Sequence, residues 1–199
     1  MQSSKKHLAV FASGGGSNLR VLYDATQGGL LQEAEVSLVI SNNSKCGAIE
    51  FAKEKHITSE HISSLKYGSE VQAEEKILQV LQDSDIDLVV LAGYMKKLPS
   101  AVVQKSKGRI VNIHPALLPK HGGEGMYGLN VHKAVLASGD SQSGATVHFV
   151  EGEYDTGTII MQEKCEVLPS DTPESLQSRV KDLEHTLYPQ AIASVLSHL

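Results

Sequence analysis

Three things are scarce in this sequence: cysteine, long apolar runs and clustered positive charge. Its two cysteines, Cys46 and Cys165, fit no paired spacing, which argues against a disulfide framework and is consistent with a reducing compartment. No apolar run reaches the roughly 20 residues that cross a bilayer. The apolar stretch behind the N-terminal lysines, residues 8–12, is too short for a signal peptide. We therefore expect a cytoplasmic protein with no membrane partner.

The charge balance excludes another class of partner. The formal net charge is −5 at pH 7, and the basic residues are scattered along the chain. Because nucleic-acid binding favours a basic stripe or patch, we expect no nucleic-acid partner. Any anion that this protein binds must be held by local groups against an unfavourable overall field.

Strands and helices alternate along the first part of the chain. Strands are expected at residues 8–12, 35–40, 56–62, 87–92 and 108–113, the third being the weakest. Near-continuous apolar runs such as 88–92 indicate burial on both faces, as in a parallel sheet covered by helices. A loop rich in proline and glycine then runs to residue 128, followed by a helix over 130–138. Two closely joined strands, 144–150 and 158–167, are expected to be antiparallel. The sequence predicts one α/β domain over residues 1–199.

The last helix has a clear predicted start. Asp171-Thr-Pro-Glu174 offers a cap, a proline in the first turn and a carboxylate three residues on. Pro189 lacks a backbone N–H and clashes with the preceding turn of a helix. We therefore expect a kink or break at residues 188–189, with a short tail beyond.

A glycine-rich turn, Ser-Gly-Gly-Gly-Ser-Asn at residues 13–18, follows the first strand and opens a helix. Glycines let the backbone approach an anion, and free N–H groups at a helix start complement its charge. The spacing matches neither the dinucleotide fingerprint nor the P-loop. From these residues alone, a small phosphate site and a plain tight turn are both open.

Asn112 and His114 stand at the end of a predicted strand, two residues apart, and so face the same side. Ligands of open α/β sheets bind at the carboxyl ends of strands, and Pro115 ends the strand there by keeping His114 extended. Histidine transfers protons near neutral pH, and an amide donates to negative charge developing on oxygen. The pair predicts acid–base chemistry, against the alternative of a satisfied buried histidine.

A third group lies on the later strands. Thr146 and His148 share one strand face, and Asp155 follows in a loop flanked by glycines. A carboxylate beside an imidazole favours its protonated form and positions it, so Asp155 is a candidate partner of His114. By itself, the Asp-Thr-Gly triplet could equally be a hairpin turn.

The histidines also raise the possibility of a metal site. His114, His121, His132 and His148 have no recognised zinc spacing, and no cysteine cluster accompanies them. We rank this below the acid–base interpretation and expect no metal. The stretch 121–128, His-Gly-Gly-Glu-Gly-Met-Tyr-Gly, is predicted to be a mobile binding loop whose role the residues do not define.

Several segments together resemble a known family. They are Ser-Gly-Gly-Gly-Ser-Asn-Leu at 13–19, Leu-Ala-Gly-Tyr-Met at 91–95, Asn-Ile-His-Pro-Ala-Leu-Leu-Pro at 112–119, Gly-Ala-Thr-Val-His-Phe at 144–149 with Asp155, and Glu-His-Thr-Leu-Tyr-Pro at 184–189. The chain resembles the folate-dependent phosphoribosylglycinamide formyltransferases from end to end. The Asn-x-His-Pro segment with a distant aspartate is general to folate formyl-handling enzymes. The glycine-rich turn and the terminal Glu-His-x-x-Tyr-Pro narrow the resemblance to the glycinamide enzymes.

This resemblance implies a fold, an activity and a set of site residues. The fold is a Rossmann-like sheet, mostly parallel with an antiparallel C-terminal pair and helices on both faces. The activity is formyl transfer from 10-formyltetrahydrofolate, without a metal, to the amine of phosphoribosylglycinamide in purine biosynthesis. The implied catalytic residues are Asn112, His114 and Asp155, supported by Thr146 and His148. The implied ribonucleotide ligands are Gly16, Ser17, Asn18, Lys181 and Glu184; the folate would contact Met95, Lys96, Lys97, Leu98, Asn112 and the loop 150–155.

Two departures from the family pattern leave contacts open. Lys96 stands where many members have an arginine, and lysine cannot make the same planar bidentate contact. The loop after Pro119 is longer than in many relatives, so its ribonucleotide contacts do not carry over. Alternatives are a formyltetrahydrofolate deformylase, a methionyl-tRNA formyltransferase, or a non-catalytic binding module of similar fold. The first two usually carry an extra domain, for which 199 residues leave no room.

Overall fold

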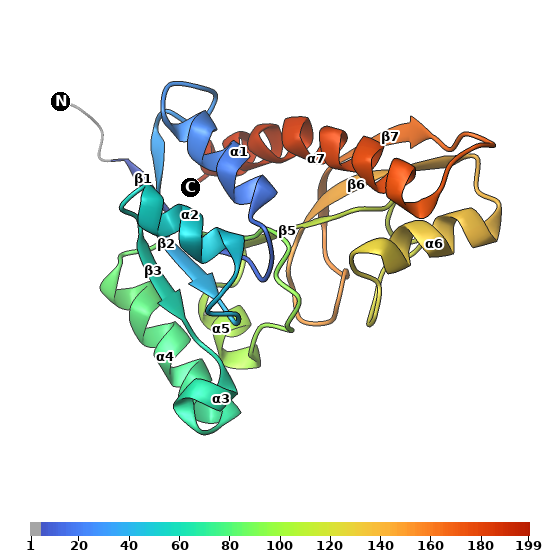
Figure 1. Cartoon of the computed structure of the whole chain (residues 1–199). Coiled ribbons are helices and arrows are strands. Elements are labelled where there is room, and N and C mark those ends of the chain that lie inside the picture. The colour runs from blue at the N-terminus through green and yellow to red at the C-terminus, as the bar shows by residue number, and fades with distance from the viewer. Residues whose placement is uncertain (1–4) are drawn as a thin grey trace.

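The computed structural model describes residues 5–199, which form a seven-stranded sheet in the order β3-β2-β1-β4-β5-β6-β7 (Figure 1). Strands β1 to β5 pair in parallel, whereas β6 is antiparallel to both β5 and β7. This confirms the predicted fold class. Residues 1–4, the start of the segment weighed above as a signal peptide, lie outside the described residues. The strands are Lys6–Phe11 (β1), Ala34–Ser41 (β2), Thr58–His61 (β3), Leu88–Leu91 (β4), Ile110–His114 (β5), Gln142–Phe149 (β6) and Ile159–Glu166 (β7).

Helices cover both faces of the sheet because successive side chains of a strand point to opposite faces. Leu8 and Val10 of β1 belong to the core shared with the first, second, sixth and seventh helices. Ala9 and Phe11 belong to the core shared with the fourth and fifth. The patterns above did not predict the two short helices, α3 and α5. The helices are Ser17–Thr26 (α1), Gly47–Glu54 (α2), Ser64–Tyr67 (α3), Glu70–Asp83 (α4), Ser100–Lys105 (α5), Leu129–Ser138 (α6) and Pro173–Leu196 (α7).

The register of β5 against β6 decides which polar groups meet. Asn112 lies opposite His148, and His114 lies opposite Thr146. Cross-strand neighbours on one face are close enough for direct contact. The two pairs that share a strand face in the sequence are therefore also neighbours across the sheet.

Helix α7 corrects one prediction. It runs without interruption from Pro173 to Leu196, through Pro189, so of the expected kink or break at residues 188–189 the break is wrong. A proline removes one hydrogen bond of a helix, and here the turns on both sides are held by packing, since Tyr188, Ile192 and Val195 are buried. The predicted start is right, but its capping box joins Thr172 to Ser175.

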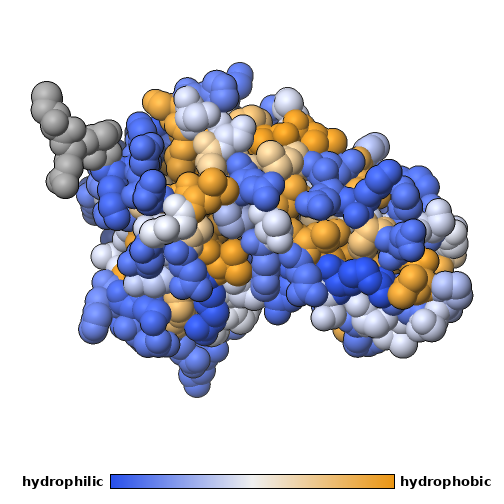
Figure 2. Space-filling view, turned by 90° about the horizontal axis from the view of Figure 1, so that it is seen from above, coloured by the Kyte–Doolittle hydropathy of each residue, from blue (hydrophilic) through white to orange (hydrophobic). Residues whose placement is uncertain are grey.

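The outer surface is mixed in polarity. On the face seen from above in Figure 2, apolar residues form patches that polar residues interrupt. No helix within residues 5–199 is both long and apolar enough to cross a membrane.

Candidate active site

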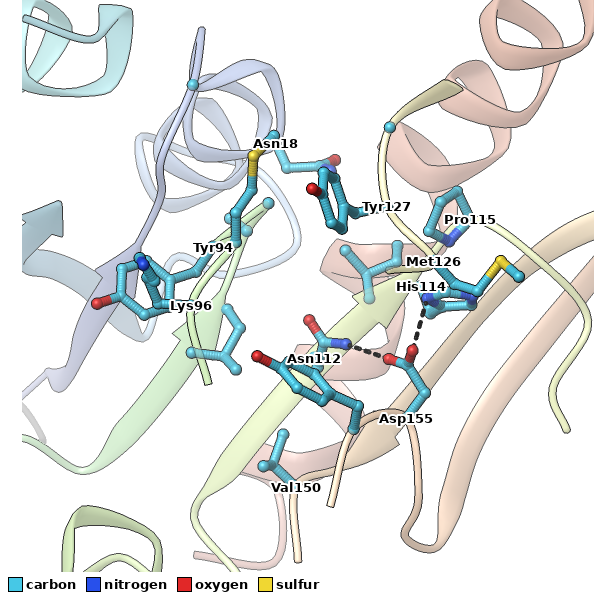
Figure 3. A pocket seen from close by; sticks show the side chains of 18 of the residues that line it. Asn18, Tyr94, Lys96, Asn112, His114, Pro115, Met126, Tyr127, Val150 and Asp155 are labelled. Atoms are coloured by element: carbon cyan, nitrogen blue, oxygen red, sulfur yellow. Dashed lines mark hydrogen bonds and ion pairs between the residues drawn. The ribbon is translucent and has the colours of Figure 1, made fainter. Parts of the chain in front are cut away.

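A cavity of about 620 Å³ lies at the carboxyl ends of β1, β4 and β5, where open α/β sheets bind their ligands. Its walls come from segments far apart in the sequence. The glycine-rich turn and α7 line it, as do the end of β5, the loop after β4, the loop before α6 and the loop between β6 and β7. Figure 3 shows Asn112, His114 and Asp155 facing one another in this hollow, with Met126 and Tyr127 around it.

Asn112 points its amide into a defined polar environment. Its Nδ2 lies 3.1 Å from Nε2 of His148 and 3.4 Å from Oδ1 of Asp155. Nδ1 of His148 lies 2.8 Å from the carbonyl oxygen of Phe149. Because a carbonyl only accepts, that Nδ1 carries the proton and Nε2 of the neutral ring accepts from Asn112. His148 therefore orients the amide with its nitrogen towards the catalytic aspartate candidate.

His114 and Asp155 form a buried pair. Nδ1 of His114 lies 3.3 Å from Oδ2 of Asp155, and the two side chains are only 4% and 10% exposed. Burial acts to raise the pKa of Asp155, but the interactions with His114 and with the Gly123 amide outweigh it and leave that pKa well below its usual value. Asp155 is therefore a carboxylate at neutral pH, and this carboxylate faces Nδ1 of His114. The aspartate sits at a φ of 53°, a left-handed conformation that aspartate tolerates better than most residues.

The backbone of residues 121–123, which we call the bracket segment, contacts both members of this pair. The carbonyl oxygen of His121 lies 2.8 Å from Nε2 of His114, and the amide of Gly123 donates to Oδ2 of Asp155 at 2.9 Å. The sequence motifs did not reveal these contacts, because main-chain groups leave no side-chain pattern. They place the start of the expected mobile loop in direct contact with the candidate catalytic residues.

The glycine-rich turn forms the opposite end of the cavity. Gly16 precedes α1 in a left-handed conformation, with φ at 74°, and a Cβ there would stand 3.0 Å from the Cα of Ala48. A glycine is therefore required for both conformation and space. The first N–H groups of α1 have no partner within the helix and suit an anion.

Two residues of α7 meet this turn. Oε2 of Glu184 accepts from Nδ2 of Asn18 at 3.0 Å, and Lys181 lines the cavity one helical turn earlier. Burial raises the pKa of Glu184, while Asn18 and nearby positive groups act in the opposite direction. Oδ1 of Asn18 is buried without a partner among the described residues. It is left free to accept from a bound molecule.

The segment after β4 borders the remaining part of the cavity. Met95, Lys96, Lys97 and Leu98 all line it, together with Val150 and Tyr154 from the loop after β6. Lys97 bridges the two segments, with its Nζ at 2.9 Å and 2.8 Å from the carboxylate oxygens of Glu153. Lys96 contributes a cation to the same wall.

Known proteins resemble this chain in family pattern, in sequence and in structure. A family model described as formyl transferase matches residues 6–192. A phosphoribosylglycinamide formyltransferase of Haemophilus influenzae is 36% identical over 187 residues, covering 94% of this chain and 85% of that protein. The chain belongs to the phosphoribosylglycinamide formyltransferase family.

Other members agree in sequence and in structure. A chloroplastic phosphoribosylglycinamide formyltransferase of Arabidopsis thaliana is 43% identical over 192 residues, which is 96% of this chain. The chain spans 65% of the length of that plant relative. The crystal structure of a phosphoribosylglycinamide formyltransferase from Bacillus halodurans has a TM-score of 0.89 at 34% identity, with 96% of each chain covered. The likeness to that member extends over the whole fold.

Thr146 and His148, the two residues expected to support the catalytic groups, have different contacts. Thr146 is fully buried and does not line the cavity. Its Oγ1 donates to the carbonyl of Ala116 at 2.6 Å and accepts from the amide of Leu118 at 3.1 Å. Thr146 therefore fixes the chain just after His114, whereas His148 lines the cavity and contacts Asn112 directly.

Some residues that line the cavity were not singled out from the sequence. Tyr94, Met126 and Tyr127 line the cavity, and burial raises the pKa of Tyr94 to about 12. His132 also lines the cavity and is buried; its burial and the nearby His114 lower its pKa to about 4. His132 is therefore neutral at pH 7. Tyr94 lies within the Leu-Ala-Gly-Tyr-Met segment that carries the family resemblance, but no role was assigned to it. His132 was considered only as a metal ligand.

The metal hypothesis finds no support in the part of the chain that the structure covers. Among residues 5–199, no three histidine, cysteine, aspartate or glutamate side chains are grouped to hold a metal ion. Of the four histidines weighed as ligands, His121 pairs with Asp140 at 2.8 Å, and His114 and His148 contact Asp155.

Proposed function

We propose that this protein transfers the formyl group of 10-formyltetrahydrofolate to the amine of 5′-phosphoribosylglycinamide, a step of purine biosynthesis. The observation that carries the proposal is one cavity in which Asn112, His114 and Asp155 lie between a glycine-rich helix start and the walls after β4 and β6. The helix start suits a phosphate. The opposite walls suit a larger, partly apolar donor, since they combine Met95, Leu98 and Val150.

The three polar residues suit direct attack of an amine on the formyl carbon. Asn112 donates from Nδ2 to the formyl oxygen as that oxygen gains negative charge. A C–N bond forms to the attacking amine and the C–N bond to the folate breaks. His114 supplies positive charge near the oxyanion and assists the movement of a proton from the amine to the departing folate nitrogen. A water molecule positioned by Asp155 carries that proton. Asp155 keeps His114 protonated and, with the bracket segment, in place.

The two ends of the cavity divide the substrates. Amides of Gly16, Ser17 and Asn18 hold the phosphate of the ribonucleotide, and Lys181 and Glu184 hold its remaining polar groups. Residues 95–98, with Asn112 and the 150–155 loop, hold the folate. We further propose that residues 1–199 act as one formyltransferase domain, without a metal or a nucleic-acid partner, in the cytoplasm.

A turnover assay with purified protein tests the function. The wild type should form formylated product from phosphoribosylglycinamide and 10-formyltetrahydrofolate at the same rate with and without a chelator. Omitting the amine tests for hydrolysis, and methionyl-tRNA replaces it in a parallel reaction. Formate release without an amine would indicate a deformylase, and formylated tRNA the other transferase. Calorimetric binding of both substrates without product would indicate a binding module and contradict the proposal.

A further inference from the structure

The bracket segment is anchored from outside the cavity by a side-chain hydrogen bond between His121 and Asp140. Nε2 of His121 lies 2.8 Å from Oδ2 of Asp140, and the other oxygen of Asp140 accepts from Lys120 at 2.8 Å. Asp140 follows the Gly139 cap of α6, so it is fixed by the end of that helix. Hydrogen bonds from His121 and Lys120 lower the pKa of Asp140 below its usual value. The carboxylate is charged at neutral pH and binds the His121 ring firmly.

The bracket segment is also constrained along its backbone. His121 adopts a φ of 55°, a conformation that costs energy for a residue with a side chain and persists where surrounding contacts hold it. At Gly122, a Cβ would stand 2.6 Å from Cδ2 of Leu118 and 3.1 Å from Cβ of Asp155. The segment therefore fits closely against the loop that carries Asp155.

The bracket segment contacts the ring of His114 through the carbonyl oxygen of His121. The His121 carbonyl can only accept, so Nε2 of His114 must carry a proton for this contact, and Nδ1 is left facing Asp155. The titratable groups that face this ring are Asp155, neutral His132 from α6 and Glu184 from α7. None of these replaces the carbonyl as the acceptor 2.8 Å from Nε2.

We propose that Asp140 and His121 form a positioning pair that holds the His121 carbonyl against His114 and thereby fixes the ring and its Nε2 proton for formyl transfer. Neither residue of the pair lines the cavity, and the pair acts through the backbone of residue 121. The inference rests on the proposed function only in taking His114 and Asp155 as the reacting pair.

The first test is spectroscopic and needs no substrate. In the wild type, the Nε2 proton of His114 is bonded and its residue is 3% exposed, so ¹H–¹⁵N spectra should show a slowly exchanging ring proton. Asp140→Ala should lose this protection, and Asp140→Asn, which retains an acceptor for His121, should restore part of it. Lys120→Met is the matched control: it also removes a 2.8 Å bond to Asp140, and protection should remain.

The second test separates turnover from binding. Asp140→Ala should lower kcat at least about tenfold, because small misplacements of a catalytic group have effects of up to about 10²-fold, and KM for both substrates should stay nearly constant. His121→Asn is a second variant for the case in which Asp140→Ala folds poorly. Asparagine tolerates the positive φ but is too short to reach Asp140, so kcat should fall in the same way. An unchanged kcat, or an unchanged ring-proton exchange rate, in these variants overturns the proposal. Because the exchange measurement needs no turnover, it stands even where the function test fails.

Discussion

Replacing Asn112 by alanine should separate the catalytic role of this residue from its structural one. Nδ2 of Asn112 has two hydrogens; one is directed at Nε2 of His148 at 3.1 Å, and the other meets Asp155 only at 3.4 Å. That second hydrogen is the one available to a formyl oxygen. Losing such a donor costs about 10²–10³ in kcat, or roughly 2.7–4 kcal/mol of activation free energy.

The same change has a smaller effect on stability. His148 is 1% exposed, and its Nε2 would lose its donor, which costs about 1–3 kcal/mol in the free energy of unfolding. Asn112→Asp keeps the shape but puts an acceptor opposite His148 and Asp155, so it should be at least as inactive as alanine. Asn43→Ala makes the same change at an exposed position, where the amide oxygen only accepts from the backbone N–H of Lys45 at 3.1 Å, and it should leave turnover unchanged.

The measurements are steady-state turnover with both substrates and urea unfolding of each variant. A loss of turnover with a retained cooperative transition supports the oxyanion role. Near-normal kcat in Asn112→Ala would refute the reasoning, however large the change in stability.

Three further substitutions test other parts of the structure. Asp155→Asn should move the pH profile of turnover to lower pH. In the wild type, the lowered pKa of Asp155 stabilises the fold above about pH 4, and this contribution is lost as the pH falls through that pKa. Acid unfolding of the variant and the wild type would show the difference. Tyr188→Phe removes a fully buried hydroxyl that donates to the carbonyl of Leu91 at 2.8 Å and should lower the free energy of unfolding by about 1–3 kcal/mol, measured in urea. Gly122→Ala should reduce turnover about tenfold or more by displacing Asp155, and normal kinetics would show that the loop yields instead.

Much of the fold could be predicted because strand periodicity and chain order are local properties. Asn112 and His114 occupy the end of a buried strand in the sequence, and the structure places them there. The antiparallel pair was predicted from the short connection between the last two strands. The continuation of α7 past Pro189 could not be predicted, since it depends on packing by residues distant in sequence.

The site was predictable only as far as side chains define it. The proximity of Asp155 to His114 was expected from chemistry and loop position, and the observed separation is 3.3 Å. The carbonyl of His121 and the amide of Gly123 belong to the backbone, so no residue type identifies them. Asp140 likewise looks like an ordinary turn residue until the fold places it beside His121.

The bond between Asn18 and Glu184 joins positions 166 residues apart, and it has a consequence for how the protein matures. Contacts of such long range form late, because most of the chain must be ordered before they become favourable. The end of the cavity that we propose for the ribonucleotide is therefore complete only in the folded state. A ligand that binds there only in the folded state would stabilise that state by about 2.7 kcal/mol at a concentration 100 times its Kd, so the folded fraction would depend on how much ligand is present.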